Sequence, residues 1–134
     1  MKTTNYHSTL IAVAEDCTAT VAGRPPTRVT PTIAELQHDL IAASPYELTS
    51  DDVLFEVHAR RTEARPDDRE RLRAEFFAQE RACLRASPLP KRYGWGIHHD
   101  EHGRVALVAV ESERYRELEA DPDVRVVRAL RSGR

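Results

Sequence analysis

Two stretches in the last third of the chain carry the clearest strand pattern. Over residues 93–98, three bulky side chains alternate with two glycines and a histidine, which is the period of two of a strand with unlike faces. Residues 105–110 are apolar at every position, so they predict a strand covered on both sides. A polar loop, Asp100–Gly103, separates the two stretches, and its glycine suits a tight turn. We therefore predict a β-hairpin at the centre of the fold.

The predicted hairpin has one bulky face and one nearly bare face. A four-residue loop pairs Trp95 with Val108 on the bulky face. On the opposite face, Gly96 faces Leu107 and lies beside Gly94. Glycine weakens a strand, so two glycines on one face mark a bulge or a close approach to the backbone. We expect the approaching group to be either a ligand or another part of the protein.

Apolar residues at helical spacing predict three helices. The first begins after Thr32, which forms a capping-box pattern with Glu35, and it ends before Ser44. The second covers residues 67–81 and carries a narrow apolar stripe on a densely charged surface. The third covers residues 112–120 and is stopped by the proline that follows.

Three further stretches predict strands. Residues 6–14 are β-branched and apolar at their centre. Residues 53–60 alternate apolar and polar side chains and contain β-branched and aromatic residues, which favours a strand. A helix capped by Ser50 is the alternative for this stretch. Residues 124–131 predict a closing strand, although their spacing also fits a helix.

The segments between these elements have the chemistry of loops. Residues 18–30 contain a glycine, two prolines and several threonines. Residues 83–86 are expected to be extended and to lead into a turn at 87–90. This order of elements predicts a single α+β domain over residues 1–134, with a mostly antiparallel sheet. We expect two to three helices on one face of that sheet and the Trp- and Gly-containing hairpin at its centre.

The composition is typical of a soluble, cytoplasmic protein. Apolar residues make up 40% of the 134 residues and charged residues 31%, and no apolar run approaches the roughly 20 residues of a membrane span. The N-terminus lacks a basic region followed by an apolar segment, so no secretory signal is expected. Cys17 and Cys83 are far apart and match no metal-binding spacing, so we expect free thiols and no cofactor.

The charge distribution limits the kinds of partner that the chain would bind. A net charge of −2 argues against a protein that binds nucleic-acid backbones in general. Residues 1–59 hold three basic and eight acidic residues, whereas residues 60–134 hold 17 basic and 14 acidic residues. This asymmetry favours a local anion site in the second part. The sequence does not determine the oligomeric state.

A cluster of cationic, polar and aromatic residues before and within the hairpin is our candidate ligand site. Guanidinium, hydroxyl and ammonium groups near open backbone and an aromatic ring suit a carboxylate, a phosphate or a single nucleotide. The residues are Arg85, Ser87, Lys91, Arg92, Tyr93, Gly94, Trp95, Gly96 and His98. In the structural alternative, Trp95 belongs to the core and the two arginines pair with carboxylates. The candidate carboxylates are Asp51, Asp52 and Glu56.

Histidines and a thiol offer two other kinds of site. His98, His99 and His102 could supply metal nitrogens. The first two are adjacent and point to opposite faces of a strand, so no metal site is predicted. Cys83 near Arg85, with His98 as the base, would make an activated thiol. We identify no third group that would orient the histidine.

Five short segments form a specific pattern that extends over most of the chain. They are TTNY at 3–6, VAEDC at 13–17, TSDDVLF at 49–55, ASPL at 86–89 and KRYGWGIH at 91–98. Together with residues 128–131, they resemble a family of small bacterial proteins known as domain of unknown function 6157. The resemblance implies one compact domain and a bacterial, cytosolic context, and it carries no assigned activity. The loop at 99–102 lies outside the family motif.

Three hypotheses of function follow. The leading one is a non-enzymatic module that binds a small anionic ligand or a partner at the surface formed by residues 85–98. The second is a thiol or acid–base enzyme that uses Cys83 or His98. The third is a DNA-binding module, because the order of hairpin, short helix and closing strand is similar to the MmcQ/YjbR-like domains, for which such a role has been proposed. The sequence does not decide whether the protein is an enzyme.

Overall fold

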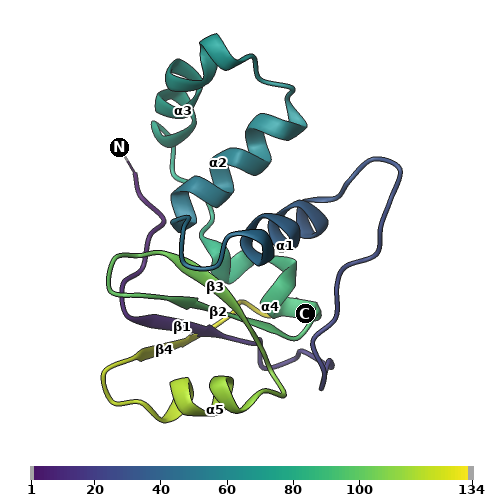
Figure 1. Cartoon of the computed structure of the whole chain (residues 1–134), viewed down its shortest axis with the longest axis vertical. Coiled ribbons are helices and arrows are strands. Elements are labelled where there is room, and N and C mark those ends of the chain that lie inside the picture. Colours follow the sequence, from purple (N-terminus) through teal and green to yellow (C-terminus); the bar gives the residue numbers. More distant parts are fainter. Residues whose placement is uncertain (1, 133–134) are drawn as a thin grey trace.

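A computed structural model describes residues 2–132, which form a four-stranded sheet with helices on both sides (Figure 1). The elements, in chain order, are β1 (Thr9–Ala12), α1 (Ile33–Ala43), α2 (Ser50–Arg61), α3 (Arg69–Phe77), α4 (Pro88–Arg92), β2 (Trp95–His99), β3 (Val105–Ala109), α5 (Glu113–Ala120) and β4 (Arg125–Arg128). Short 3-10 helices at Pro66–Asp68 and Leu84–Ala86 precede α3 and α4. The predicted α+β class and the Trp- and Gly-containing hairpin are confirmed, with β3 of the hairpin at one edge of the sheet.

The sheet is mixed. Its strand order is β3-β2-β1-β4, with β1 antiparallel to β2 and β2 antiparallel to β3, while β1 and β4 are parallel. Strands therefore form at the centres of the two predicted ranges, β1 within residues 6–14 and β4 within residues 124–131. The parallel pair is the departure from the expected antiparallel arrangement.

Helices cover both faces of the sheet, so the prediction that they lie on one face is wrong. On one side, Tyr115 of α5 packs over Leu10 of β1. On the other side, Ile41 of α1 and Val53 of α2 share a core with Ile11 (Figure 1). All four residues of β1 are buried, and a strand without a polar face requires a layer on each side.

Helix α2 replaces the strand predicted over residues 53–60. Thr49 Oγ1 accepts a hydrogen bond from the Asp52 N–H, and the Asp52 carboxylate accepts one from the Thr49 N–H, so a complete capping box starts the helix. Residues two apart on a helix point to nearly opposite sides. Val53 packs in the core next to the sheet, whereas Phe55 packs against α3. Burial on two sides therefore produces the alternating pattern that favoured a strand.

Prolines begin helical turns in two places where the sequence predicted other structure. Ser87 Oγ accepts a hydrogen bond from the Leu89 N–H and Pro88 occupies the first helical position, so a helix stands where a turn was expected. The segment 83–86, predicted to be extended, contains a 3-10 helix at Leu84–Ala86.

The helix predicted over residues 67–81 is shorter than expected. Its first two residues belong to a 3-10 turn that begins at Pro66, and α3 itself covers only Arg69–Phe77.

Helix α1 begins at the predicted cap, but two polar residues, Glu35 and Gln37, lie on its buried face. Thr32 Oγ1 accepts a hydrogen bond from the Glu35 N–H, which confirms the N-terminal cap. The Glu35 carboxylate does not close a capping box; it is buried and accepts hydrogen bonds from the backbone of Arg28 and the side chain of Arg24. Glu35 thereby fastens the loop before α1 onto the helix.

Candidate functional site

The hairpin register differs by one residue from the predicted one. Gly96 pairs with Val108 and not with Leu107. The Asp100 carboxylate accepts hydrogen bonds from two backbone N–H groups of the turn, the second of them from Arg104. These bonds stabilise a turn one residue longer than we predicted, and the longer turn shifts the pairing of every residue in the hairpin.

The glycine face of the hairpin is filled by the protein itself. A Cβ on Gly96 would lie 2.7 Å from Cε2 of Tyr115, so the group that approaches this strand closely is the ring of α5. Gly94 has a φ of +78°, and a Cβ there would lie 3.1 Å from the Cα of Ala22 in the loop before α1. The prediction of an open backbone floor at Gly94 and Gly96 is therefore wrong.

The two aromatic residues beside these glycines both pack against the core. Trp95 pairs with Ala109, and its Nε1–H donates a hydrogen bond of 2.9 Å to the Gly23 carbonyl. The Trp95 ring also lies 5.6 Å from the ring of His38. Tyr93 is partly buried against the same core. The structural alternative therefore describes Trp95 better than the ligand-stacking hypothesis does.

Arg85 and Ser87 bind neighbouring segments of the chain. Arg85 Nε donates a hydrogen bond of 2.7 Å to the Arg128 carbonyl. Ser87 Oγ donates one of 2.6 Å to Oε1 of Gln37, in addition to capping α4. Both side chains thus hold the segment before α4 in place.

The carboxylates that were expected to pair with Arg85 and Arg92 have other partners. Asp52 pairs with Arg73, and Glu56 pairs with Arg69. Asp51 is 1% exposed and accepts hydrogen bonds from the N-terminal segment, described below. The specific ion pairs of the structural alternative are therefore not the ones that form.

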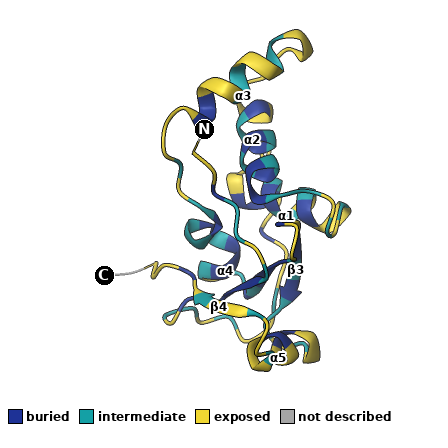
Figure 2. Ribbon diagram, turned by 90° about the vertical axis from the view of Figure 1, so that its left-hand side faces the viewer, coloured by how far each residue is buried: buried dark blue, intermediate teal, exposed yellow. Residues whose placement is uncertain are grey.

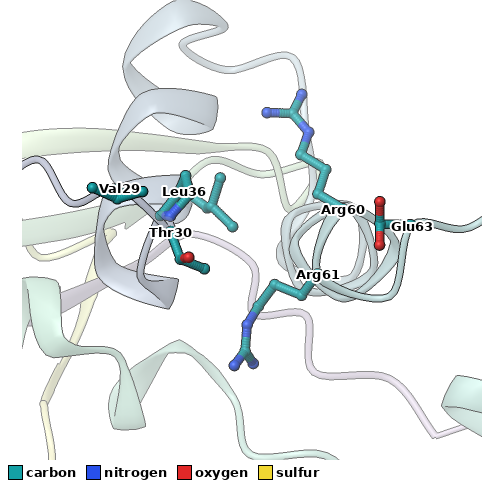
Figure 3. A pocket seen from close by; sticks show the side chains of 7 residues that line it. Val29, Thr30, Leu36, Arg60, Arg61 and Glu63 are labelled. Carbon is teal, nitrogen blue, oxygen red and sulfur yellow. The ribbon is translucent and has the colours of Figure 1, made fainter.

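Arg92 and Tyr93 line a pocket of about 460 Å³ between the start of α1, the end of α2 and α4. The lining residues are Thr30, Pro31, Thr32, Ile33, Ala34, Arg61, Pro88, Arg92 and Tyr93. An adjoining pocket of about 490 Å³ shares three of these residues, among them Arg61, and is also lined by Arg60 (Figure 3). We call these two pockets together the arginine groove.

The arginine groove is rich in arginine. The side chains of Arg60, Arg61 and Arg92 are exposed, and none of the three forms a hydrogen bond or an ion pair with any residue in the range 2–132. One carboxylate, that of Glu63, also lines the groove. Figure 3 shows that Arg60 and Arg61 leave the end of α2 in opposite directions, so they flank the groove. The first turn of α1 also borders it, and the N–H groups of a first helical turn carry partial positive charge.

Sequence reasoning found two residues of this groove. It identified Arg92 and Tyr93, and it missed Arg60 and Arg61 because it assigned residues 53–60 to a strand. In the structure both arginines lie in the last turn of α2, so the helical alternative for this stretch was the correct one. Lys91 lies on α4 but outside the pocket lining.

His98 and Cys83 are not brought together. His98 is 8% exposed, and its Nδ1 shares a hydrogen bond of 2.8 Å with the Tyr46 hydroxyl. Burial lowers the pKa of His98 below its ordinary value. Cys83 shares a hydrogen bond of 3.2 Å with the hydroxyl of Tyr6, whose ring packs on His99. Because His98 and His99 point to opposite faces of β2, the thiol and the His98 ring lie on different sides of the sheet.

Residues 2–132 contain neither a metal-binding cluster nor a helix that could span a membrane. Over residues 2–132, no three or more histidine, cysteine, aspartate or glutamate side chains are grouped so that they could hold one metal ion. In the same range, no helix has both the length and the apolar character needed to cross a bilayer.

The fold and the groove define a small α+β domain with a basic groove between three helices. A comparison with known families matches the whole chain, residues 1–134, to a family of unknown function, DUF6157, and the chain belongs to that family. No curated protein and no solved structure matches the chain. The resemblance seen in the sequence is thus confirmed.

Proposed function

We propose that this protein is a non-enzymatic binding module for small anionic ligands, and that the arginine groove is its binding site. One observation carries the proposal: Arg61 and Arg92 border the same pocket, and neither has an acidic partner among residues 2–132. Several other arginines of the chain do have such partners. Arg24 binds Asp39, for example, and Arg73 binds Asp52.

The chemistry of the groove suits a carboxylate or a phosphate. A guanidinium presents two parallel N–H donors that match the two oxygens of either group. The first turn of α1 adds partial positive charge to the same pocket. Tyr93 supplies an aromatic wall against which a planar ligand could pack. The class of ligand, a small anion, is the one that the sequence predicted. The binding site is the arginine groove and not the surface of residues 85–98 as a whole.

A thermal-shift panel tests this proposal. The probes are inorganic phosphate, citrate, benzoate and adenosine monophosphate, each at low ionic strength because salt screens exposed charges. At least one probe is expected to raise the melting temperature, since ligand binding to the folded state stabilises it. Arg61→Gln and Arg92→Gln should each remove most of that shift.

The matched control is Arg104→Gln. Arg104 is also an exposed arginine, and its side chain forms no hydrogen bond or ion pair within residues 2–132. It lies in the hairpin turn, outside the groove. This variant should respond to the probes like the wild type. Equal shifts in all four proteins, or no shift with any probe, would refute the proposal.

The two other hypotheses remain predictions with their own tests. An activated Cys83 would react with iodoacetamide faster than a model thiol at neutral pH, because the thiolate is the nucleophile. A DNA-binding module would retard duplex DNA in a gel at low salt and lose this binding steeply as salt rises. A negative result in either test removes that hypothesis and leaves the arginine groove unaffected.

A further inference from the structure

A smaller, mainly apolar slot opens beside the arginine groove. It has a volume of about 160 Å³ and lies between α1, α2 and the end of α3. Its lining residues are Ile33, Gln37, Leu54, Val57, His58, Arg61 and Phe76. Ile33 and Arg61 line the 460 Å³ pocket as well, so the slot and the groove share these residues.

We infer that the ligand is a small carboxylic acid with a ring-sized apolar body, whose acid group binds Arg61 and whose body enters the slot. This inference rests on the proposed function, because it names the class of anion that the arginine groove would take. It commits to a small molecule and not to a protein segment, since the slot has the size of a single ring.

The volume of the slot supports a ring. Apolar cavities of about 150 Å³ lined by leucine, isoleucine and phenylalanine stay dry and bind benzene. Here Ile33, Leu54, Val57 and Phe76 provide walls of the same kind. The ring of His58 lies 4.7 Å from that of Phe76, which adds a second flat surface.

A polar donor on a nearly buried residue also points to a ligand. Gln37 is 4% exposed, and its Oε1 accepts the hydrogen bond from Ser87 Oγ. Ser87 Oγ accepts the Leu89 N–H and donates its own proton to Gln37, so the amide oxygen of Gln37 faces Ser87 and the amide nitrogen does not. The Gln37 amide nitrogen has no partner among residues 2–132, and this nearly buried residue lines the slot. A ring that carries a hydroxyl or carbonyl oxygen would satisfy this donor.

Charge selects an acid over a neutral ring. Arg61 is the residue shared by the slot and by both pockets of the groove, so its guanidinium is available to a group at the junction. A carboxylate next to a ring places one anionic group at Arg61 and the apolar body among the slot residues. A neutral ring would leave the guanidinium without a partner, and a short acid would leave the slot unfilled.

The test compares four probes by calorimetric titration and by the line shapes of protein NMR spectra. Benzoate and 4-hydroxybenzoate combine an acid with a ring, whereas acetate has only the acid and benzyl alcohol only the ring. Both aromatic acids are expected to bind at least tenfold more tightly than acetate or benzyl alcohol. Arg61→Gln should weaken the binding of the aromatic acids at least tenfold.

A second variant separates the slot from the groove. His58 lines the slot and neither pocket of the groove, and it is only partly buried, so His58→Trp would reduce the volume of the slot. This variant should weaken benzoate at least tenfold and leave acetate and phosphate unchanged. Circular dichroism and a urea midpoint equal to those of the wild type would establish that both variants fold.

The outcomes distinguish this inference from the proposed function. If acetate, phosphate and benzoate bind equally well and His58→Trp changes none of them, the groove binds anions and the slot inference is wrong. If benzoate binds and Arg61→Gln has no effect, the acid group is placed wrongly. If no probe binds the wild type, both proposals fall together.

Discussion

His99 is the least conventional residue of the core. It is fully buried in β2, its Nδ1 lies 3.3 Å from the Ile97 carbonyl, and its Nε2 has no hydrogen-bond partner among the described residues. The ring packs edge-on against Tyr6. Burial lowers the pKa of His99 to about 4, with the neighbouring His98 and the nearby His7 acting in the same direction. A neutral imidazole is therefore part of the folded core.

We expect the protein to lose stability as the pH falls from 6.5 to 4. Above pH 6.5, His99 is neutral in both the folded and the unfolded chain. Between pH 6.5 and 4, the unfolded chain binds a proton that the folded chain excludes, so protonation favours unfolding. The loss in the free energy of unfolding should reach about 3 kcal/mol from this residue. Urea denaturation at pH 8, 6 and 4 measures it.

His99→Phe provides the comparison for this prediction. The variant keeps a flat ring and has no group that titrates in this range, so its stability should change less between pH 8 and 4 than that of the wild type. His102→Phe, in the exposed hairpin turn, should keep the pH dependence of the wild type. A wild type and a His99→Phe variant with the same pH dependence would show that another group is responsible.

At the scale of elements, the sequence predicted the presence of the hairpin and the cap residues more reliably than the register of the hairpin or the surroundings of each element. The hairpin and the start of α1 could be predicted because a turn and a cap residue define them locally. The strand predicted over residues 53–60 failed because α2 is buried on two sides, and such a helix loses the single apolar stripe that identifies an amphipathic helix. The site predicted from the sequence lacked Arg60 and Arg61 for the same reason, since α2 determines where these two side chains lie.

The contact between β2 and α5 gives a prediction at this scale. Gly96→Ala should lower the free energy of unfolding by about 1–3 kcal/mol, because the added methyl group would overlap the buried ring of Tyr115. Gly23→Ala is the matched control, since a Cβ at Gly23 meets nothing within 4 Å. Its effect should stay within about 0.5 kcal/mol. Equal urea midpoints for the two variants would contradict the close packing of α5 on the sheet.

At the scale of the whole molecule, segments far apart in the sequence are joined by buried hydrogen bonds. The N-terminal segment and the start of α2 meet at Asp51, whose carboxylate accepts hydrogen bonds from the hydroxyl of Thr3 and from the N–H and hydroxyl of Thr4. The Thr4 hydroxyl also lies 2.9 Å from that of Ser50. Two of the segments that resemble the family, TTNY and TSDD, thus contact each other. Their role in this structure is to hold the fold together, and no spacing rule in the sequence indicates such a contact.

Asp51→Ala should destabilise the protein by about 3 kcal/mol, because it leaves the buried Thr4 N–H and hydroxyl without their acceptor. Hydrogen exchange at the Thr4 amide should accelerate in the same variant, since that N–H loses its protection. Asp67→Ala changes an exposed carboxylate in the turn before α3 and should leave both measurements unchanged. A Thr4 amide that remains protected without Asp51 would show that this carboxylate does not fasten the segment.

The parallel pairing of β1 with β4 also bears on how the chain reaches its native state. β1 lies between β2 and β4, and both of these strands come from the second half of the chain (Figure 1). β4 itself is mostly exposed (Figure 2). The hairpin of β2 and β3 can form early because its residues are neighbours in sequence. β1 must wait for partners that are distant along the chain, and folding that depends on distant partners is slow. Until β4 arrives, one side of β1 is an unpaired edge with apolar side chains on both faces, which is the kind of edge through which partly folded chains associate.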